Sequence, residues 1–209
     1  MLIGLIPYIR KDMVEHAVMS LSDCDAVYTH HGEYGEIEAR NRLLELVPSD
    51  SVVRFCDDDD TAANTRTMFD FLGDASVVVA SYRINNARIV TVPRNALAIA
   101  TNYVAPWNWV AKIKDLYKIR DRFGSFFDPS WVCNTGTRFW LRMIDVGLKF
   151  RVMPDVVCYN WNRGTVNSKS SLPKNDKSLY AELLRRGAPK NLVKDRIRFD
   201  NSDTTLNTM

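Results

Sequence analysis

The first 80 residues alternate between short apolar runs and longer stretches whose apolar side chains recur at helical spacing. The short runs are rich in β-branched residues, which favours buried strands over helices. The predicted strands are 2–6, 26–28, 52–56 and 76–80. The predicted helices are 12–21, 37–46 (with Leu43, Leu44 and Leu46 inward) and 61–72. Because such alternation gives a mostly parallel sheet covered by helices, the expected fold class is α/β.

The second half of the chain has a less regular pattern. Two strand-like runs, 87–91 and 96–100, lie on either side of Pro93 and predict a small mixed β region. Further helices are predicted at 112–122, 138–146 and 177–186, and further strands at 150–152 and 156–159. We therefore expect one α/β domain over residues 1–165 and a basic helical extension over residues 166–209.

Four consecutive carboxylates, Asp57 to Asp60, follow the predicted strand 52–56. Like charges this close repel one another, so the run should face water or a cation. Ligands of open α/β sheets bind outside the carboxyl ends of the strands, where an acidic cluster suits a divalent metal with a phosphorylated ligand. The alternative is a solvated turn in which Asp60 caps a helix that begins at Thr61.

Charge and cysteine usage exclude some classes of protein. The net charge of +3 is uneven, with +5 on residues 163–209 and −2 on the remainder. The basic segment suits phosphates, an anionic membrane surface or nucleic acid, or it is a solvated helix face. The four cysteines form no CxxC pair, which argues against a zinc site and a secreted disulfide scaffold, and Cys56 and Cys158 are expected to be buried thiols. With no signal peptide and no membrane-spanning run, a bacterial, viral or host cytoplasmic location is expected.

Several short motifs occur in a recognisable order. They are residues 2–10 with Pro7-Tyr8, Ala39-Arg40-Asn41, Phe55 to Asp60, Trp107-Asn108 with Lys112, and 139–147 followed by 154–159. Together they resemble family 2 glycosyltransferases of the GT-A fold, over about residues 1–165. In this resemblance the acidic run corresponds to the metal-binding DxD motif, in the frame Asp57-x-Asp59.

The resemblance implies a Rossmann-like enzyme that moves a hexosyl or pentosyl group from a nucleotide-diphosphate donor to a hydroxyl acceptor. A UDP-sugar is the favoured donor, and Mn²⁺ or Mg²⁺ is the implied cofactor, which would stabilise the departing diphosphate. Asp59 would ligate the metal and Asp57 would contact the ribose or the water shell of the metal. Asp58 can exchange roles with either, and the sequence leaves that choice open.

The resemblance also implies a set of donor-binding residues. They are Pro7, Tyr8, Arg10, His31, Arg40, Asn41, Asp57, Asp58 and Arg163. Pro7 and Tyr8 would line the pocket of the base, with Tyr8 stacking on it, although a core aromatic is the alternative for Tyr8. Arg40 would approach the ribose or the diphosphate, and its alternative is a surface charge on a helix.

The chain departs from the family pattern in three places. Residues 29–32 replace an acid that bonds the nucleotide base, although His31 can still bond a base edge. Residues 134–137 replace a Glu-Asp pair that supplies the catalytic base, so Asp128 becomes the candidate base, with a structural turn before Pro129 as its alternative. Residues 159–164 replace a His near the metal and offer Asn162 as a ligand.

Trp161 and Trp107 are the candidate acceptor platforms, because sugar and base faces stack on indole, and packing is the alternative role of Trp161. The acceptor is expected to be a glycan, a protein, a lipid-linked sugar or modified DNA, and the basic segment suggests an anionic one. Two other functions stay open. The missing Glu-Asp pair would suit a catalytically degenerate binding module, whereas a nucleotidyltransferase would need a Gly-rich loop that residues 1–7 lack.

Overall fold

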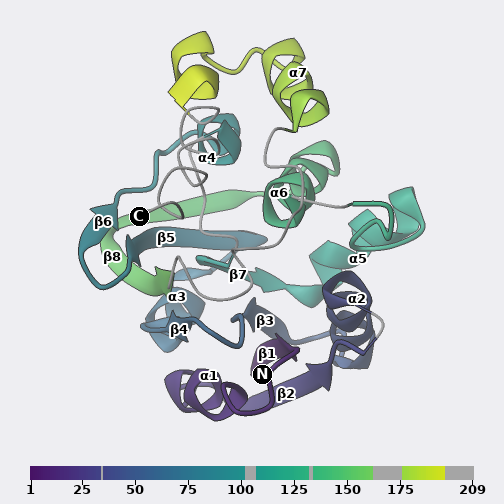
Figure 1. The fold of residues 1–209 in the computed structure, drawn as a ribbon, viewed down its shortest axis with the longest axis vertical. Coiled ribbons are helices and arrows are strands. Elements are labelled where there is room, and N and C mark those ends of the chain that lie inside the picture. The colour runs from purple at the N-terminus through teal and green to yellow at the C-terminus, as the bar shows by residue number, and fades with distance from the viewer. Residues whose placement is uncertain (34, 102–106, 132–133, 162–175, 196–209) are drawn as a thin grey trace, which may run out of the picture.

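The computed structural model describes residues 1–33, 35–101, 107–131, 134–161 and 176–195, apart from the side chain of Trp161. An eight-stranded sheet has the order β2-β1-β3-β7-β5-β8-β4, and β6 pairs with β5 (Figure 1). The strands are β1 (Leu2–Tyr8), β2 (Ala26–His31), β3 (Val52–Phe55), β4 (Thr61–Ala62), β5 (Val77–Ile84), β6 (Arg88–Val90), β7 (Trp109–Lys112) and β8 (Phe150–Trp161). Strands β1, β2, β3, β5 and β8 run parallel, which confirms the predicted α/β class.

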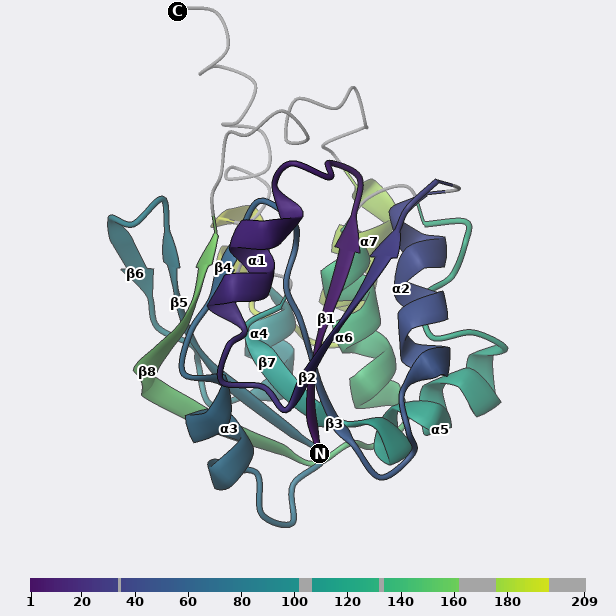
Figure 2. The ribbon, with the colours of Figure 1, turned by 90° about the horizontal axis from the view of Figure 1, so that it is seen from below.

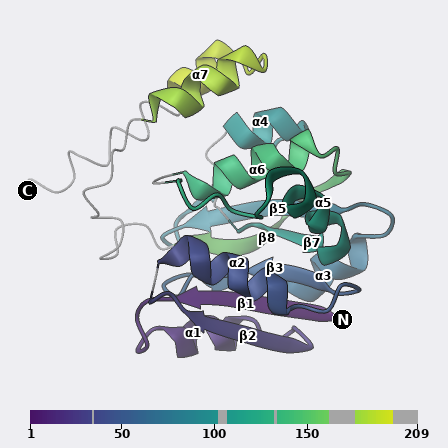
Figure 3. The same ribbon diagram turned by 90° about the vertical axis from the view of Figure 1, so that its right-hand side faces the viewer.

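Seven named helices cover the sheet in the described part of the chain. They are α1 (Val14–Ser20), α2 (Glu36–Leu46), α3 (Thr65–Phe71), α4 (Ala96–Thr101), α5 (Ile113–Phe123), α6 (Thr135–Asp145) and α7 (Lys177–Arg185). Figure 2 shows α1 and α3 on one side of β1 and β3, and α2, α5 and α6 on the other. Figure 3 shows α4, α6 and α7 stacked on the side of the sheet away from α1.

The core beside the end of β3 is aromatic. The Phe55 ring lies 5.0 Å from that of Trp107 and 6.1 Å from that of Trp109. Phe127 and Phe139 stack at 4.2 Å on the same cluster. All five side chains are buried, so the strand that precedes the acidic run rests on a rigid apolar base.

Two predicted elements change type in the structure. Residues 96–100 belong to helix α4 and not to a strand, because the Asn95 carboxamide accepts hydrogen bonds from the amides of Leu97 and Ala98 and so caps a helix. Residues 61–62 pair with β8 as strand β4, and helix α3 begins only at Thr65. The prediction of a helix from Thr61 with Asp60 as its cap is therefore wrong.

The structure also differs from the predictions in the exposure of one leucine and in the number and extent of the strands. Leu46, expected to face inward, is 63% exposed, because it lies off the buried face of α2 that carries Leu43 and Leu44. The two short strands around Pro154 form one strand, β8, whose pairing with β5 is irregular next to Ser81. Strand β7 was not predicted, and it joins β3 and β5 in antiparallel pairing.

The described part of the basic extension contacts helix α6. Arg138 donates two hydrogen bonds to Asp176, at 2.9 and 2.8 Å, and Arg186 pairs with Asp145 at 2.6 and 2.9 Å. The predicted boundary near residue 165 lies outside the described residues. Among the residues described, no helix has the length and apolar character needed to cross a membrane. Cys56 and Cys158 are buried free thiols, as expected.

Candidate functional site

The carboxyl ends of the parallel strands bring the polar motifs of the sequence to one edge of the sheet. Tyr8 at the end of β1 pairs in register with His31 at the end of β2. The amide of Cys56 donates to the carbonyl of Leu5 at 3.0 Å, so the acidic run leaves the sheet beside β1. Figure 2 shows the ends of β1 and β2 pointing in the same direction. This edge is where ligands of open α/β sheets bind.

Asp58 fixes the loop that follows β1. Its carboxylate accepts hydrogen bonds from the amides of Ile9 and Arg10, both at 3.0 Å, and from the Arg10 guanidinium at 2.8 Å. Burial raises the pKa of Asp58, but the bonds from Arg10 and the two amides outweigh it and hold the pKa below its usual value. The same guanidinium lies 3.1 Å from Asp59. Arg10 therefore bridges two carboxylates at the mouth of the site.

The buried Arg40 side chain positions Asp57. The Arg40 guanidinium donates to Asp57 at 2.7 Å, also bonds Glu36, and stacks on the Trp107 ring at 3.9 Å. Arg40 is 0% exposed, so it positions Asp57 and does not itself reach a ligand in this conformation, and the surface-charge alternative is wrong. Burial raises the pKa of Asp57 to about 6, although the nearby Arg40 charge lowers it.

Asp60 is buried and serves the packing of β8. The Tyr159 hydroxyl donates to its carboxylate at 2.6 Å and accepts a bond from the Asp57 amide at 3.4 Å. Burial and the two carboxylates raise the pKa of Tyr159 well above 10, so the phenol stays protonated and remains a donor. Tyr159 therefore links the acidic run to β8, a contact that the sequence did not reveal.

Tyr8 and His31 form a ring pair at the same edge. Their centroids are 5.3 Å apart at an interplanar angle of 39°, with Tyr8 half-buried and His31 exposed. Pro7 is buried behind them. The pair offers one exposed aromatic surface beside Arg10, which suits a planar base next to a phosphate.

Two expected site residues have surroundings other than an open site. Asn41 donates to the Phe127 carbonyl and accepts from the Phe127 amide, each at 2.9 Å, so it anchors a loop and faces no open site. Trp107 is 1% exposed beneath Arg40, which corrects its assignment as an acceptor platform. The side chain of Trp161, and Asn162 and Arg163, lie outside the described residues.

Asp128 has the geometry of a turn. It accepts from the Ser130 amide at 3.0 Å and from the Ser130 hydroxyl at 2.7 Å, and it pairs with Arg142 at 3.1 Å. The two bonds from Ser130 lower the pKa of Asp128, and the Arg142 charge adds to this. A carboxylate with a lowered pKa is a weak base, so its geometry supports the turn alternative.

The metal-binding capacity of the site rests on few ligands. Within the ranges that the structure describes, no group of three or more His, Cys, Asp and Glu side chains is arranged to hold a metal ion. Asp59 contributes a carboxylate whose side chain is 13% exposed. Mg²⁺ is commonly bound by one or two carboxylates together with substrate phosphates and water, and Asp59 fits that kind of site.

Two residues outside the predicted set also shape the site. Glu36 lies one helical turn before Arg40, and this i,i+4 spacing is a sequence signal for the pair. Arg54 is buried within β3 and donates to the Ala63 carbonyl, to Thr65 and to the Cys158 carbonyl. It ties β3 to the segment after the acidic run, and its place in an apolar strand gave no hint of these partners.

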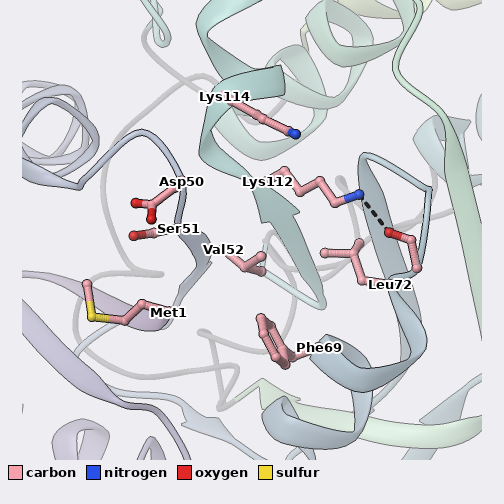
Figure 4. A pocket seen from close by; sticks show the side chains of 9 residues that line it. Met1, Asp50, Ser51, Val52, Phe69, Leu72, Lys112 and Lys114 are labelled. Atoms are coloured by element: carbon pink, nitrogen blue, oxygen red, sulfur yellow. Dashed lines mark hydrogen bonds between the residues drawn. The ribbon is translucent and has the colours of Figure 1, made fainter.

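A cavity of about 330 Å³ lies at the opposite edge, where β3 begins (Figure 4). Val52, Phe69 and Leu72 form its apolar part, and the Lys112 ammonium donates to the Gly73 carbonyl at 2.7 Å. Because it adjoins the amino end of β3, the whole length of that strand separates it from the acidic run. It is not part of the candidate site.

The predicted GT-A fold is confirmed by the similarity of the structure to solved structures. The chain is similar to residues 1–349 of S. aureus TarS in complex with UDP-GlcNAc, with a TM-score of 0.66 and 14% identity over 99% of this chain and 73% of that one. The same part of TarS in complex with UDP gives a TM-score of 0.62 and 14% identity, over 97% and 69% of the two chains. A further TarS structure gives 0.63 and 13%, over 88% and 39%. No family model matches the sequence, and no curated protein matches it.

Proposed function

We propose that this protein is a glycosyltransferase that moves a sugar from a nucleotide-diphosphate donor to a hydroxyl group. The observation that carries the proposal is the acidic run at the carboxyl edge, beside the Tyr8–His31 ring pair and Arg10. The GT-A fold supports it, because TarS structures of this fold contain UDP-GlcNAc or UDP. A UDP-sugar is therefore the proposed donor.

The base of the donor would lie on the exposed ring pair, and its diphosphate would lie toward Arg10. Arg10 already faces Asp58 and Asp59, so its guanidinium has only a short way to turn toward a phosphate. Asp58 keeps the Arg10 backbone fixed through two amide bonds while the side chain turns. This arrangement positions a cation at the group that gains negative charge as the sugar leaves.

Asp59 is the proposed ligand for Mn²⁺ or Mg²⁺. When bound, such an ion would act as a Lewis acid toward the diphosphate leaving group. Asp57 is proposed to contact the ribose, held in place by Arg40 from below. Asp60 has no role in binding here, because its carboxylate is committed to Tyr159 inside the protein.

A binding module without catalysis is the second candidate. Residues 134–137 contain no carboxylate, and the carboxylate of Asp128 is engaged by Ser130 and Arg142. A base for the acceptor hydroxyl is therefore not evident in the described part of the chain. Donor hydrolysis separates the two candidates, because an active transferase also passes its sugar to water.

The test is a thermal-shift panel of UDP, GDP, CDP and TDP and their sugars, with and without Mn²⁺, followed by UDP-GlcNAc hydrolysis. A ligand present at about 100 times its Kd stabilises the folded state by about 2.7 kcal/mol, which corresponds to roughly 5–10 °C for a chain of this size. We expect one nucleotide to give a metal-dependent shift that Asp59→Ala abolishes. Asp121→Ala, which removes an exposed carboxylate on α5, is the matched control and should keep the shift.

Each outcome of the panel has one meaning. A metal-dependent shift together with sugar release supports the transferase. A shift without sugar release in the wild-type protein favours the binding module. If no nucleotide raises the melting temperature, or if Asp59→Ala turns over the donor at the full rate, the proposed donor site is wrong.

A further inference from the structure

A second hollow, of about 520 Å³, is lined by residues of β4, β5 and β8 and by the start of α3. Its polar lining includes Thr61, Asn64, Thr67, Arg83, Asn86 and Asn160. Thr61 directly follows Asp60, and Asn160 directly follows Tyr159, whose hydroxyl bonds Asp60. Two of its lining residues are therefore neighbours, along the chain, of residues in the acidic-run network, whereas none of its lining residues is assigned to the donor.

Strand register places three of these residues in one row. Arg83 on β5 pairs with Asn160 on β8, and Asn160 pairs with Thr61 on β4. Directly paired residues present their side chains on the same face of a sheet. The row therefore offers a guanidinium, a carboxamide and a hydroxyl side by side.

Two hydrogen bonds fix the loops that line the hollow. The Asn64 carboxamide donates to the Val157 carbonyl at 2.8 Å, and the Asn86 amide donates to the Asn160 carboxamide oxygen at 2.9 Å. Asn64 and Asn86 both have positive φ, at 53° and 58°, a conformation that asparagine adopts more readily than most residues. The polar groups are thus set in place before a ligand arrives, which is typical of binding sites.

Arg83 is the cationic residue of the described lining, and Asp155 is the anionic one. Arg83 is half-buried, and within the described ranges its side chain makes no hydrogen bond and no ion pair. Other arginines around the fold, such as Arg10, Arg40 and Arg186, are paired with carboxylates. Asp155 also lines the hollow but is exposed and makes no ion pair with Arg83. A guanidinium that no described carboxylate engages, among carboxamides and hydroxyls, suits a ligand with one anionic group and several hydroxyls.

The described lining of the hollow contains no exposed aromatic ring. Tyr159 is the aromatic residue in the lining, and it is 1% exposed. Single-stranded nucleic acids need exposed rings on which their bases stack. The described lining offers no such ring to a base or to a sugar face, so its polar groups would recognise the ligand. A glycan presents more hydroxyls to these carboxamides and to the guanidinium than DNA does.

We infer that this hollow binds the acceptor, a sugar or sugar chain that carries a phosphate or carboxylate, with the anionic group at Arg83. The inference rests on the proposed transferase function. In that reaction the acceptor oxygen bonds the anomeric carbon and loses its proton to solvent. The bond from that carbon to the diphosphate oxygen breaks, and its electron pair leaves with the diphosphate.

The test measures binding of glucose 6-phosphate, glucuronate and glucose to the full chain by NMR, following the amides of Thr61 and Asn86. We expect both acidic sugars to bind and glucose to bind at least tenfold more weakly. Arg83→Gln should weaken the acidic sugars about tenfold or more, since a hydrogen bond to a charged group contributes about 1.5–3 kcal/mol. Arg88→Gln is the matched control, because Arg88 is exposed on the neighbouring strand β6 and lies outside the lining.

A second variant tests the location without changing charge. Thr67 is exposed at the rim of the hollow, so Thr67→Trp should fill it and block all three sugars while the protein stays folded. Equal binding of glucose and glucose 6-phosphate, unchanged binding in Arg83→Gln, or no sugar binding at all would overturn the inference. Nucleotide shifts are measured on the same variants. If they persist while sugar binding fails, only the acceptor site is wrong; if sugars bind while no nucleotide does, the proposed function is wrong.

Discussion

Arg40 is the residue whose removal tests the organisation of the acidic run most directly. It is completely buried, bonds Glu36 and Asp57, and stacks on Trp107. Arg40→Met keeps most of the apolar stem and deletes the guanidinium. Glu36 and Asp57 then lose their shared counter-ion, and Trp107 loses its stacking partner. We expect a large loss of stability and a weaker donor site.

The magnitude follows from burial. Breaking a fully buried ion pair by removing one partner costs about 3–5 kcal/mol. The side chains of Glu36 and Asp57 are 49% and 24% exposed, so water replaces part of the lost interaction. We therefore expect a loss of about 2–4 kcal/mol in the free energy of unfolding. For a chain of this size that corresponds to a fall in Tm of roughly 5–15 °C.

The loss of stability in Arg40→Met should increase with pH. The pKa of Asp57 is raised from 3.8 to about 6, so the folded state holds this proton more tightly than the unfolded state. The contribution of Asp57 to stability therefore falls as pH rises from about 4 to about 6 and is constant above that range. The Arg40 charge lowers the pKa of Asp57, so this pKa is higher in Arg40→Met. In that variant the contribution of Asp57 to stability therefore keeps falling to higher pH. Arg40→Met should be more destabilising at pH 8 than at pH 5.

The assay is urea unfolding at both pH values of the wild-type protein, Arg40→Met, Asp57→Asn and the double variant. Arg42→Met is the matched control on the same helix, since Arg42 is exposed and pairs only at the surface with Glu38, and it should change stability by no more than about 0.5 kcal/mol. Asp57→Asn should recover part of the loss in the double variant at pH 8. A loss below about 1 kcal/mol, or equal losses at the two pH values, would refute the reasoning.

Two further substitutions test the neighbouring assignments. Tyr159→Phe removes the hydroxyl that donates to buried Asp60, so urea unfolding should show a loss of about 1.5–3 kcal/mol in the free energy of unfolding. A change within about 0.5 kcal/mol would show that this hydrogen bond does not stabilise the fold. Asp128→Asn keeps an oxygen for the bonds from Ser130, so donor hydrolysis and transfer should fall by less than about tenfold. A fall of about a hundredfold or more in transfer would instead identify Asp128 as the catalytic base.

The sheet was predictable because its information is local. The apolar runs of β1, β3 and β5 are rich in β-branched residues, and the stretches after β1 and β3 include apolar residues at helical spacing. Their alternation permits few topologies other than a parallel sheet. The errors arose where a partner distant in sequence decided the outcome. Residues 61–62 have helical neighbours, yet pairing with β8 made them a strand.

The acidic run shows the same division within four residues. Its position at the end of a buried strand was evident from the sequence, and so was its resemblance to a metal-binding motif. In the sequence the four carboxylates look equivalent, whereas in the structure Asp57 pairs with Arg40, Asp58 and Asp59 pair with Arg10, and Asp60 accepts from Tyr159. These partners lie 17 to 99 residues away along the chain, and only the folding of the chain brings them together.

The sequence by itself determined the α/β class, the edge of the sheet that carries the site, and the residue types that gather there. It did so because strand propensity, helical spacing and chain direction are local properties. Only the tertiary structure decided that Arg40 and Trp107 lie buried under the candidate site, that Asn41 anchors a loop, and that no carboxylate in the described ranges pairs with Arg83 in its polar hollow. Burial and pairing depend on which distant segments meet, and that is set when the whole chain packs.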